Sequence, residues 1–119
     1  MAGYFRTTKL DQAMSDRRLK LENERQMLLN KTIQWLDEYG EKYGINRAYI
    51  FGSVTRTGKF HEQSDIDVAV EQINSEDFFS VIGLVAEALG REVDIIMLDK
   101  CHFAERIRER GILWTKIHS

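Results

Sequence analysis

The sequence predicts an α/β fold of the α+β kind, in which helices pack on one face of a mixed sheet of three to four strands. Residues 9–39 contain no glycine or proline and are rich in helix-forming residues, which predicts one long helix at the start of the chain. After residue 47, short apolar runs alternate with segments whose apolar residues recur at helical spacing. The 119 residues are enough for one domain with one core.

The composition excludes several classes of protein. Basic and acidic residues nearly balance, 17 against 19, so the overall charge favours neither non-specific nucleic-acid binding nor membrane attachment. One cysteine, Cys101, rules out an internal disulfide, and no spacing of cysteine and histidine indicates a zinc site. The N-terminus lacks the apolar segment of a secretory signal, and no apolar run could span a bilayer. We therefore expect a cytoplasmic protein that does not associate with a membrane.

The second half of the predicted long helix has one apolar side, which indicates that it packs against the rest of the domain. Gly40 ends this helix, as glycine commonly does at a helix C-terminus. The apolar stripe consists of Leu28, Leu29, Ile33, Leu36 and Tyr39.

The first half of the same helix is densely charged, and its apolar residues Met14, Leu21 and Leu28 lie seven residues apart. We therefore divide the chain into a charged helical extension, residues 1–27, and a folded domain, residues 28–119. Two interpretations of the extension remain open. It is either a solvated helix or an arm that binds a partner or a second copy of the chain, giving a homodimer.

Three strands are predicted after the long helix. Residues 48–51 form a short apolar run that ends at Gly52, which is typical of a buried strand. Residues 65–70 alternate in character, and residues 92–98 form the third strand. The alternation puts Ile66, Val68 and Val70 on one face and Asp65, Asp67 and Ala69 on the other. Residues 112–117 fit either a fourth strand or a packed tail.

Two further helices are predicted between and after these strands. The first has Ser75 as its N-cap and ends at Gly90. Its shared apolar face consists of Phe78, Ile82, Val85 and Leu89. The second begins at Asp99 as its cap and ends at Gly111.

Two carboxylates on one strand suggest a bound cation. Because Asp65 and Asp67 are two residues apart, their side chains point the same way, with Cβ atoms about 6–7 Å apart. Anions this close raise one another's pKa unless a cation lies between them. Mg²⁺ takes one or two carboxylates together with water and substrate phosphate. The alternative is a strand whose polar face lies in water.

Two more features favour a site for metal and phosphate. Asp94, on the predicted third strand, would add a carboxylate and allow two metal ions to clamp an in-line displacement. Gly52 and Ser53 end the first strand in a turn that offers backbone N–H groups and a hydroxyl to a phosphate. Glycine at position 52 would let a phosphate come close, because any Cβ would block it.

These residues, in this order, resemble the nucleotidyltransferase superfamily of DNA polymerase β. The resemblance is strongest to its minimal members, small single domains often encoded beside an all-helical HEPN partner. It rests on Gly52-Ser53, eleven intervening residues, Asp65-Ile66-Asp67-Val68, and Asp94 between Val93 and Ile95. It covers residues 48–113 and implies the small nucleotidyltransferase fold.

The resemblance also implies a set of site residues. By this resemblance, the nucleotide-binding residues are Gly52, Ser53 and Arg56. The catalytic residues, which also ligate Mg²⁺ or alternatively Mn²⁺, are Asp65, Asp67 and Asp94. Of the three, Asp94 would also be the base for the acceptor hydroxyl. Arg56 departs from the family pattern, because Thr57 follows it and Gly58 comes one place late. A surface arginine is therefore the equal alternative for Arg56, and Lys59 is interpreted as a solvated loop lysine.

The activity that the resemblance implies is transfer of a nucleoside monophosphate from a nucleoside triphosphate to a hydroxyl. Larger relatives carry a further helical domain for the acceptor, and this chain has no residues left to build one, so we expect a second chain to contribute. The expected function is transfer of AMP from ATP to a helical HEPN-type protein encoded nearby, as the antitoxin of a toxin–antitoxin pair. The alternative is a non-catalytic nucleotide-binding or partner-binding module that neutralises its helical partner by occlusion.

Overall fold

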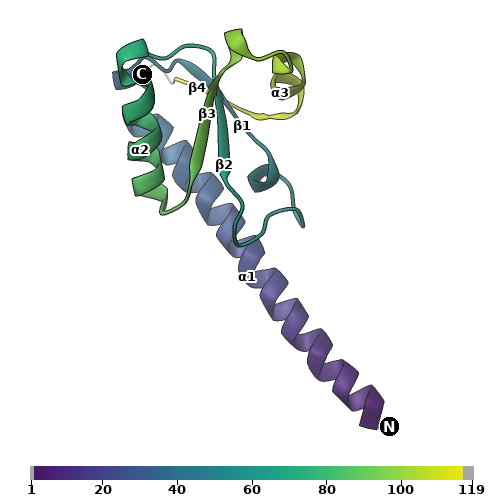
Figure 1. Cartoon of the computed structure of the whole chain (residues 1–119). Coiled ribbons are helices and arrows are strands. Elements are labelled where there is room, and N and C mark those ends of the chain that lie inside the picture. Colours follow the sequence, from purple (N-terminus) through teal and green to yellow (C-terminus); the bar gives the residue numbers. More distant parts are fainter. Residues whose placement is uncertain (1, 117–119) are drawn as a thin grey trace.

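The computed structural model describes residues 2–116, with side chains from residue 8 onward. A long helix, α1 (Ala2–Tyr39), leads into a sheet and two shorter helices (Figure 1). The strands are β1 (Arg47–Phe51), β2 (Ile66–Val70), β3 (Val93–Met97) and β4 (Ile112–Thr115), and the shorter helices are α2 (Phe78–Leu89) and α3 (Ala104–Arg110). The predicted mixed α/β fold with a long N-terminal helix is confirmed, and β4 resolves the ambiguity after residue 111 in favour of a strand.

The strands of this sheet lie in the order β3-β2-β1-β4. The central strand β1 is antiparallel to both β2 and β4, whereas β2 and β3 are parallel and are joined through α2. The register places Asp67 of β2 opposite Phe51 of β1 on one side and opposite Asp94 of β3 on the other. Residues that are 27 positions apart in the sequence are therefore neighbours in the sheet.

One face of the sheet carries the main core, and α1 and α2 cover it as predicted. From β2 this core receives Ile66, Val68 and Val70, each at most 3% exposed. The helices contribute Leu28, Trp35 and Leu36 from α1 and Val81, Val85 and Leu89 from α2. Because side chains alternate along a strand, the two aspartates of the β2 segment point to the opposite face.

The short helix α3 is the exception to the expectation that helices pack on one face. It lies on the opposite face, where Ala104 and Ile107 pack against Tyr49 of β1 and Ala69 of β2. Both faces of β1 are apolar, since Ala48 and Ile50 face the main core and Tyr49 faces α3. Sequence periodicity alone does not show which of two apolar faces a helix will cover.

Both predicted N-caps are misplaced. Ser75 begins a 3-10 turn (Ser75–Asp77), and α2 starts only at Phe78. Asp99 likewise lies within a 3-10 turn (Leu98–Lys100), and α3 starts at Ala104. Burial of Leu98, which is 2% exposed, stabilises the second turn, so tertiary packing overrides the local preference of Asp99 for a cap.

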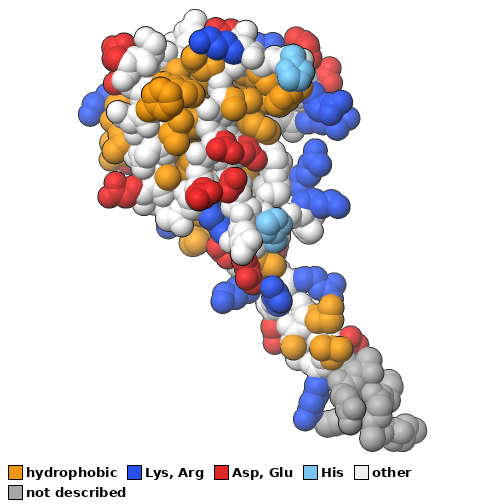
Figure 2. Space-filling view, viewed as in Figure 1, with side chains coloured by type: hydrophobic (Ala, Val, Ile, Leu, Met, Phe, Trp, Pro, Cys, Tyr) orange, Lys and Arg blue, Asp and Glu red, His pale blue; other side chains and the backbone are white. Residues whose placement is uncertain are grey.

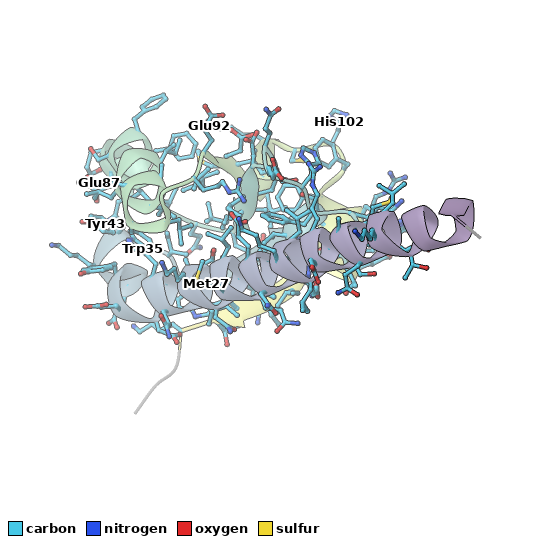
Figure 3. All side chains as sticks on the ribbon, turned by 90° about the horizontal axis from the view of Figure 1, so that it is seen from below. Met27, Trp35, Tyr43, Glu87, Glu92 and His102 are labelled. Carbon is cyan, nitrogen blue, oxygen red and sulfur yellow. The ribbon has the colours of Figure 1, made fainter. Side chains whose placement is uncertain are left out.

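The C-terminal half of α1 is fastened to the domain by aromatic residues. Trp35 stacks on Tyr43 with ring centroids 5.9 Å apart, on the side of α1 that faces α2 (Figure 3). Trp114 of β4 donates a hydrogen bond from Nε1 to Oδ1 of Asp37 at 2.7 Å. These contacts join α1 to both the sheet edge and the loop before β1.

The N-terminal half of α1 leaves the domain as an arm (Figure 2). Every described side chain from residue 8 to residue 20 is exposed, including Met14, which is 50% exposed. Burial against the domain begins at Leu21, which is half-buried, and Arg25 and Leu28 are buried. In residues 2–116, no helix is apolar over a sufficient length to cross a membrane.

Deleting residues 1–20 should leave the domain folded, with its melting temperature lowered by no more than about 3 °C. The ion pair between Arg17 and Glu62 is lost, but both side chains are exposed and such pairs contribute little. Deleting residues 1–27 removes buried Arg25 as well and should lower the melting temperature by about 5 °C or more. Thermal unfolding followed by circular dichroism measures both; equal melting temperatures for the two truncations would show that residues 21–27 do not stabilise the domain.

Candidate functional site

Asp67 is at the centre of the predicted site. It lies on β2, is half-buried, and faces away from the main core. Burial, the negative charge of Asp94 and the negative charge of Asp65, in that order, raise the pKa of Asp67 to about 6. The structure therefore brings all three predicted carboxylates close enough to affect one another.

The other two aspartates differ in exposure. Asp65 lies immediately before β2 and is half-buried, whereas Asp94 on β3 is exposed. Figure 2 shows acidic side chains gathered at the centre of this face, between apolar side chains on one side and basic ones on the other. Asp94 is thus the carboxylate of the three that a second molecule can reach most easily.

The donor set of this cluster is suited to Mg²⁺, which prefers hard carboxylate oxygens. Among the described residues, however, no three acidic, histidine or cysteine side chains are already arranged around one point as metal ligands. Carboxylates that repel one another have no reason to converge until a cation neutralises them. Burial raises the pKa of Asp67, and the charges of Asp94 and Asp65 add to this effect, so the cluster fits a cation chemically although its side chains do not yet enclose one.

Gly52 connects the end of β1 to this cluster. Its backbone dihedrals, φ 82° and ψ −159°, lie in a region that is essentially limited to glycine. A Cβ atom at this position would collide with Oδ2 of Asp67. We predicted that glycine leaves room for a phosphate; the structure adds that glycine leaves room for the Asp67 carboxylate.

Ser53 begins a short 3-10 turn, Ser53–Thr55, directly after Gly52. The turn is closed by Thr55, which donates to the carbonyl of Gly52 from its backbone N–H (3.1 Å) and from Oγ1 (2.7 Å). The first N–H groups of such a turn have no partner within it and can face an anion. The local geometry is therefore compatible with a phosphate on the Gly52-Ser53 turn.

A cavity of about 640 Å³ opens beside this turn. Gly52, Ser53 and Arg56 line it together, so the structure places Arg56 with the other two predicted nucleotide-binding residues. Lys59, interpreted from the sequence as a solvated loop residue, also lines this cavity, and α3 forms its opposite wall. The aspartates do not line this cavity, but Asp67 adjoins it at Gly52, where a Cβ atom would collide with Oδ2 of Asp67.

Sequence reasoning missed the part that α1 plays in holding this loop. Arg25 is 9% exposed and donates from Nη1 to the carbonyl of Val54, at 3.0 Å, within the Ser53–Thr55 turn. Its remaining donors bind Glu22, at 2.6 and 2.8 Å, and Thr57, at 3.4 Å. Arg25 therefore connects the long helix to the turn that carries Ser53.

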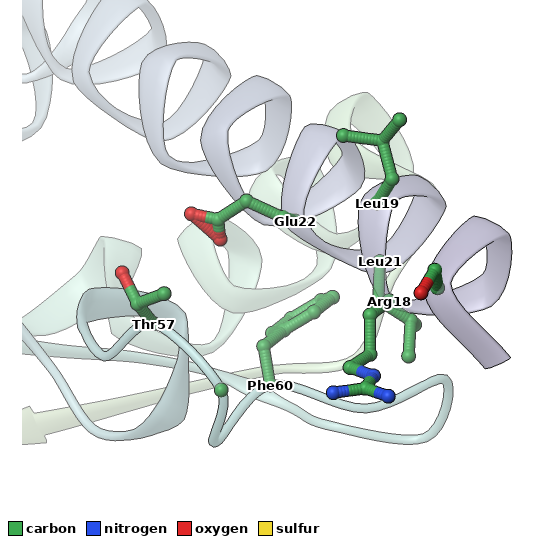
Figure 4. A pocket seen from close by; sticks show the side chains of 8 residues that line it. Arg18, Leu19, Leu21, Glu22, Thr57 and Phe60 are labelled. Carbon is green, nitrogen blue, oxygen red and sulfur yellow. The ribbon is translucent and has the colours of Figure 1, made fainter. Parts of the chain in front are cut away.

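A second contact fastens the same loop further along. Arg91 donates to the carbonyl of Glu62 and, at 2.7 Å, to the carboxylate of Glu24 on α1, while its guanidinium lies over the ring of Phe60. Figure 4 shows Glu22 of α1 facing Thr57 and Phe60 across a separate cavity of about 500 Å³. This second cavity lies between α1 and the loop.

One signal in the sequence could have indicated Arg25. Positions 21, 25, 28 and 32 follow helical spacing, so Arg25 lies on the same side of α1 as Leu21, Leu28 and Thr32. Arg25, Leu28 and Thr32 are buried and Leu21 is half-buried. A charged residue on an otherwise buried stripe requires a specific partner.

Comparisons with known proteins bear on the fold and on the class of protein. Residues 30–116 match the family model described as Polymerase beta, Nucleotidyltransferase. A solved chain from a crystal structure of a toxin–antitoxin with AMP-PNP is 26% identical, with a TM-score of 0.56 over 73% of each chain. A chain from the crystal structure of the toxin–antitoxin MntA-HepT is 24% identical, with a TM-score of 0.53 over 76% of this chain and 73% of that one. No curated protein matches the sequence.

Replacing Asp67 with asparagine should stabilise the protein at pH 7.5 in metal-free buffer and have little effect near pH 4. The pKa of about 6 in the folded state lies above the value of about 3.9 in an unfolded chain. The folded state therefore binds the proton more tightly, and stability falls as the pH rises from about 4 through 6. Melting temperatures across this range measure the effect. The control is Asp99→Asn, which removes an exposed carboxylate. If the melting temperature of Asp67→Asn falls with rising pH as much as that of wild type, Asp67 is not the group responsible.

Replacing Arg25 with methionine should lower the free energy of unfolding by about 1–3 kcal/mol, because it leaves the buried carbonyl of Val54 without its donor. The same change should increase amide hydrogen exchange in residues 53–57 more than in β2. Arg18→Met is the matched control, since Arg18 lies on the same helix and is exposed. Unchanged exchange in the loop would show that Arg25 does not hold it.

Proposed function

Because the chain belongs to the Polymerase beta nucleotidyltransferase family, as its motifs predicted, we propose that it transfers AMP from ATP to a hydroxyl of a helical partner protein. We propose in addition that the reaction requires Mg²⁺ and that the chain is the antitoxin of a toxin–antitoxin pair. The observation that carries the proposal is the position of Asp67: the charges of Asp94 and Asp65 act on its carboxylate, and it adjoins Gly52, which lines the cavity together with Ser53. The 26% identical chain from a toxin–antitoxin structure with AMP-PNP supports both ATP and a protein partner.

On the donor side, the chain holds the triphosphate. The Ser53 hydroxyl, the first N–H groups of its turn and the Arg56 guanidinium can donate to phosphate oxygens. Asp65, Asp67 and Asp94 are the proposed Mg²⁺ ligands, and the bound ion would neutralise the carboxylates and the triphosphate. Gly52 sets the distance between these two groups, because no larger residue fits against Asp67.

On the acceptor side, Asp94 is the proposed general base. It is the exposed carboxylate of the three, so an incoming hydroxyl can reach it. The hydroxyl proton passes to Asp94 while the acceptor oxygen forms a bond to the α-phosphorus. The bond between the α-phosphorus and the oxygen of the β-phosphate breaks, and pyrophosphate leaves with the bonding electrons.

The acceptor is proposed to be a hydroxyl, a tyrosine in the first instance, on a helical HEPN-type protein encoded nearby. The exposed arm of α1, residues 8–20, is the proposed contact with this partner or with a second copy of the chain. A reaction that consumes ATP and modifies a co-encoded protein would take place in the cytoplasm.

When wild-type protein is mixed with Mg²⁺, ATP labelled on the α-phosphate and the co-encoded helical protein, label should be transferred to the helical protein. Asp65→Asn and Asp94→Asn should each lower the rate at least about a hundredfold, since each removes a proposed metal ligand or the base. Asp99→Asn, outside the cluster, should retain the wild-type rate. EDTA should stop the transfer, and mass spectrometry of the product identifies the modified residue.

Two outcomes would reject parts of the proposal. Label transferred from ATP carrying it only on the γ-phosphate would indicate phosphoryl transfer and not nucleotidyl transfer. If Asp65→Asn and Asp94→Asn protect cells from the partner as well as wild type does, neutralisation occurs by occlusion, and the chain is a binding module.

A further inference from the structure

The cavity beside Gly52 and Ser53 has a basic wall formed by α3. Arg106 and Arg110 line it from this helix, and Arg56 and Lys59 line it from the loop after the turn. Residues four apart lie on the same side of a helix, so the two α3 arginines face the cavity together. Figure 2 shows basic side chains along the edge of the molecule next to the acidic centre.

These four cations have no carboxylate partner among the described residues 8–116. Arg108 lies between these two arginines on α3 but has carboxylate partners. It forms ion pairs with Glu71 at 2.7 Å and with Glu105 at 3.4 Å, and it does not line the cavity. Unpaired cations around one cavity repel one another, and a polyanion placed among them relieves that repulsion. The cavity therefore selects an anionic ligand.

The position of Gly52 sets the direction in which such a ligand would lie. Gly52 and Ser53 line the cavity, while the same glycine lies against the carboxylate of Asp67. A triphosphate bound on this turn with its α-phosphate beside the aspartates would extend its β- and γ-phosphates toward α3, which forms the other wall of the cavity.

We propose that Arg106 and Arg110 bind the β- and γ-phosphates of a nucleoside triphosphate, the part that leaves as pyrophosphate. This inference rests on the proposed function and assigns it two residues that lie outside the motifs. The planar guanidinium binds phosphate through two parallel hydrogen bonds, which suits a leaving group that gains negative charge. Phe103, Ile107 and Ile112 line the same cavity and place apolar surface beside these guanidinium groups.

Calorimetric titrations with three probes test the assignment: a non-hydrolysable ATP analogue, inorganic tripolyphosphate and AMP. Arg106→Gln and Arg110→Gln should each weaken the binding of the analogue and of tripolyphosphate at least about tenfold, as expected for a lost hydrogen bond between charged groups. AMP, which lacks the two outer phosphates, should bind equally to all proteins. Arg108→Gln is the matched control and should bind all three probes as wild type does.

The outcomes separate this inference from the proposed function. If both variants bind the analogue as tightly as wild type while wild type transfers label, the α3 arginines are not the phosphate ligands and the proposed function stands. Equal loss of AMP affinity would also overturn the inference, because the effect would not depend on the outer phosphates. Loss of partner binding alone would assign the arginines to an acidic partner surface. If wild type binds neither the analogue nor tripolyphosphate, both proposals fail.

Discussion

The alternating burial of β2 is the constraint on which the candidate site depends. Ile66, Val68 and Val70 lie in the main core, so Asp67 must face the opposite side of the sheet. A slip of one residue would put Asp67 into the main core and move three apolar side chains out of it. The free energy of core packing therefore keeps the carboxylates together against their mutual repulsion. The register with β3 then places Asp94 directly beside Asp67.

Like charges lie close together on this face, which is unfavourable in the free protein. The same charges are complementary to a charged substrate. Burial, and then the charges of Asp94 and Asp65, raise the pKa of Asp67 to about 6. The adjoining cavity gathers Arg56, Arg106 and Arg110. A bound cation would relieve the repulsion among the carboxylates, and a bound polyanion would relieve the repulsion among the arginines. Gly52 forms the boundary between the two charged regions because a side chain there would strike Asp67.

The long helix α1 has three parts with different environments. Its C-terminal part packs into the core, and its middle part supports the loop that follows Gly52 through Arg25 and through the pairing of Glu24 with Arg91. Residues 8–20 are exposed along the arm. The family match begins at residue 30, so the support provided by Arg25 lies outside it.

The sequence by itself determined the mixed fold, the long helix, the strands around Gly52 and Asp67, and the order of motifs that the family shares. These features follow from periodicity and from glycine or carboxylate residues at short spacing, which are local properties. Only the tertiary structure decided three features: the face of the sheet on which α3 packs, the burial of Arg25 against Val54, and the position of Arg106 and Arg110 beside the Gly52-Ser53 turn. Each of these depends on contacts between residues 29 or more positions apart, as for Arg25 and Val54. Helical spacing places Arg25 on a buried stripe and so indicates that it needs a partner, but it does not indicate which residue is that partner. The partner of Arg25, and whether Arg106 and Arg110 lie in solvent or in a cavity, are set by the packing of distant elements.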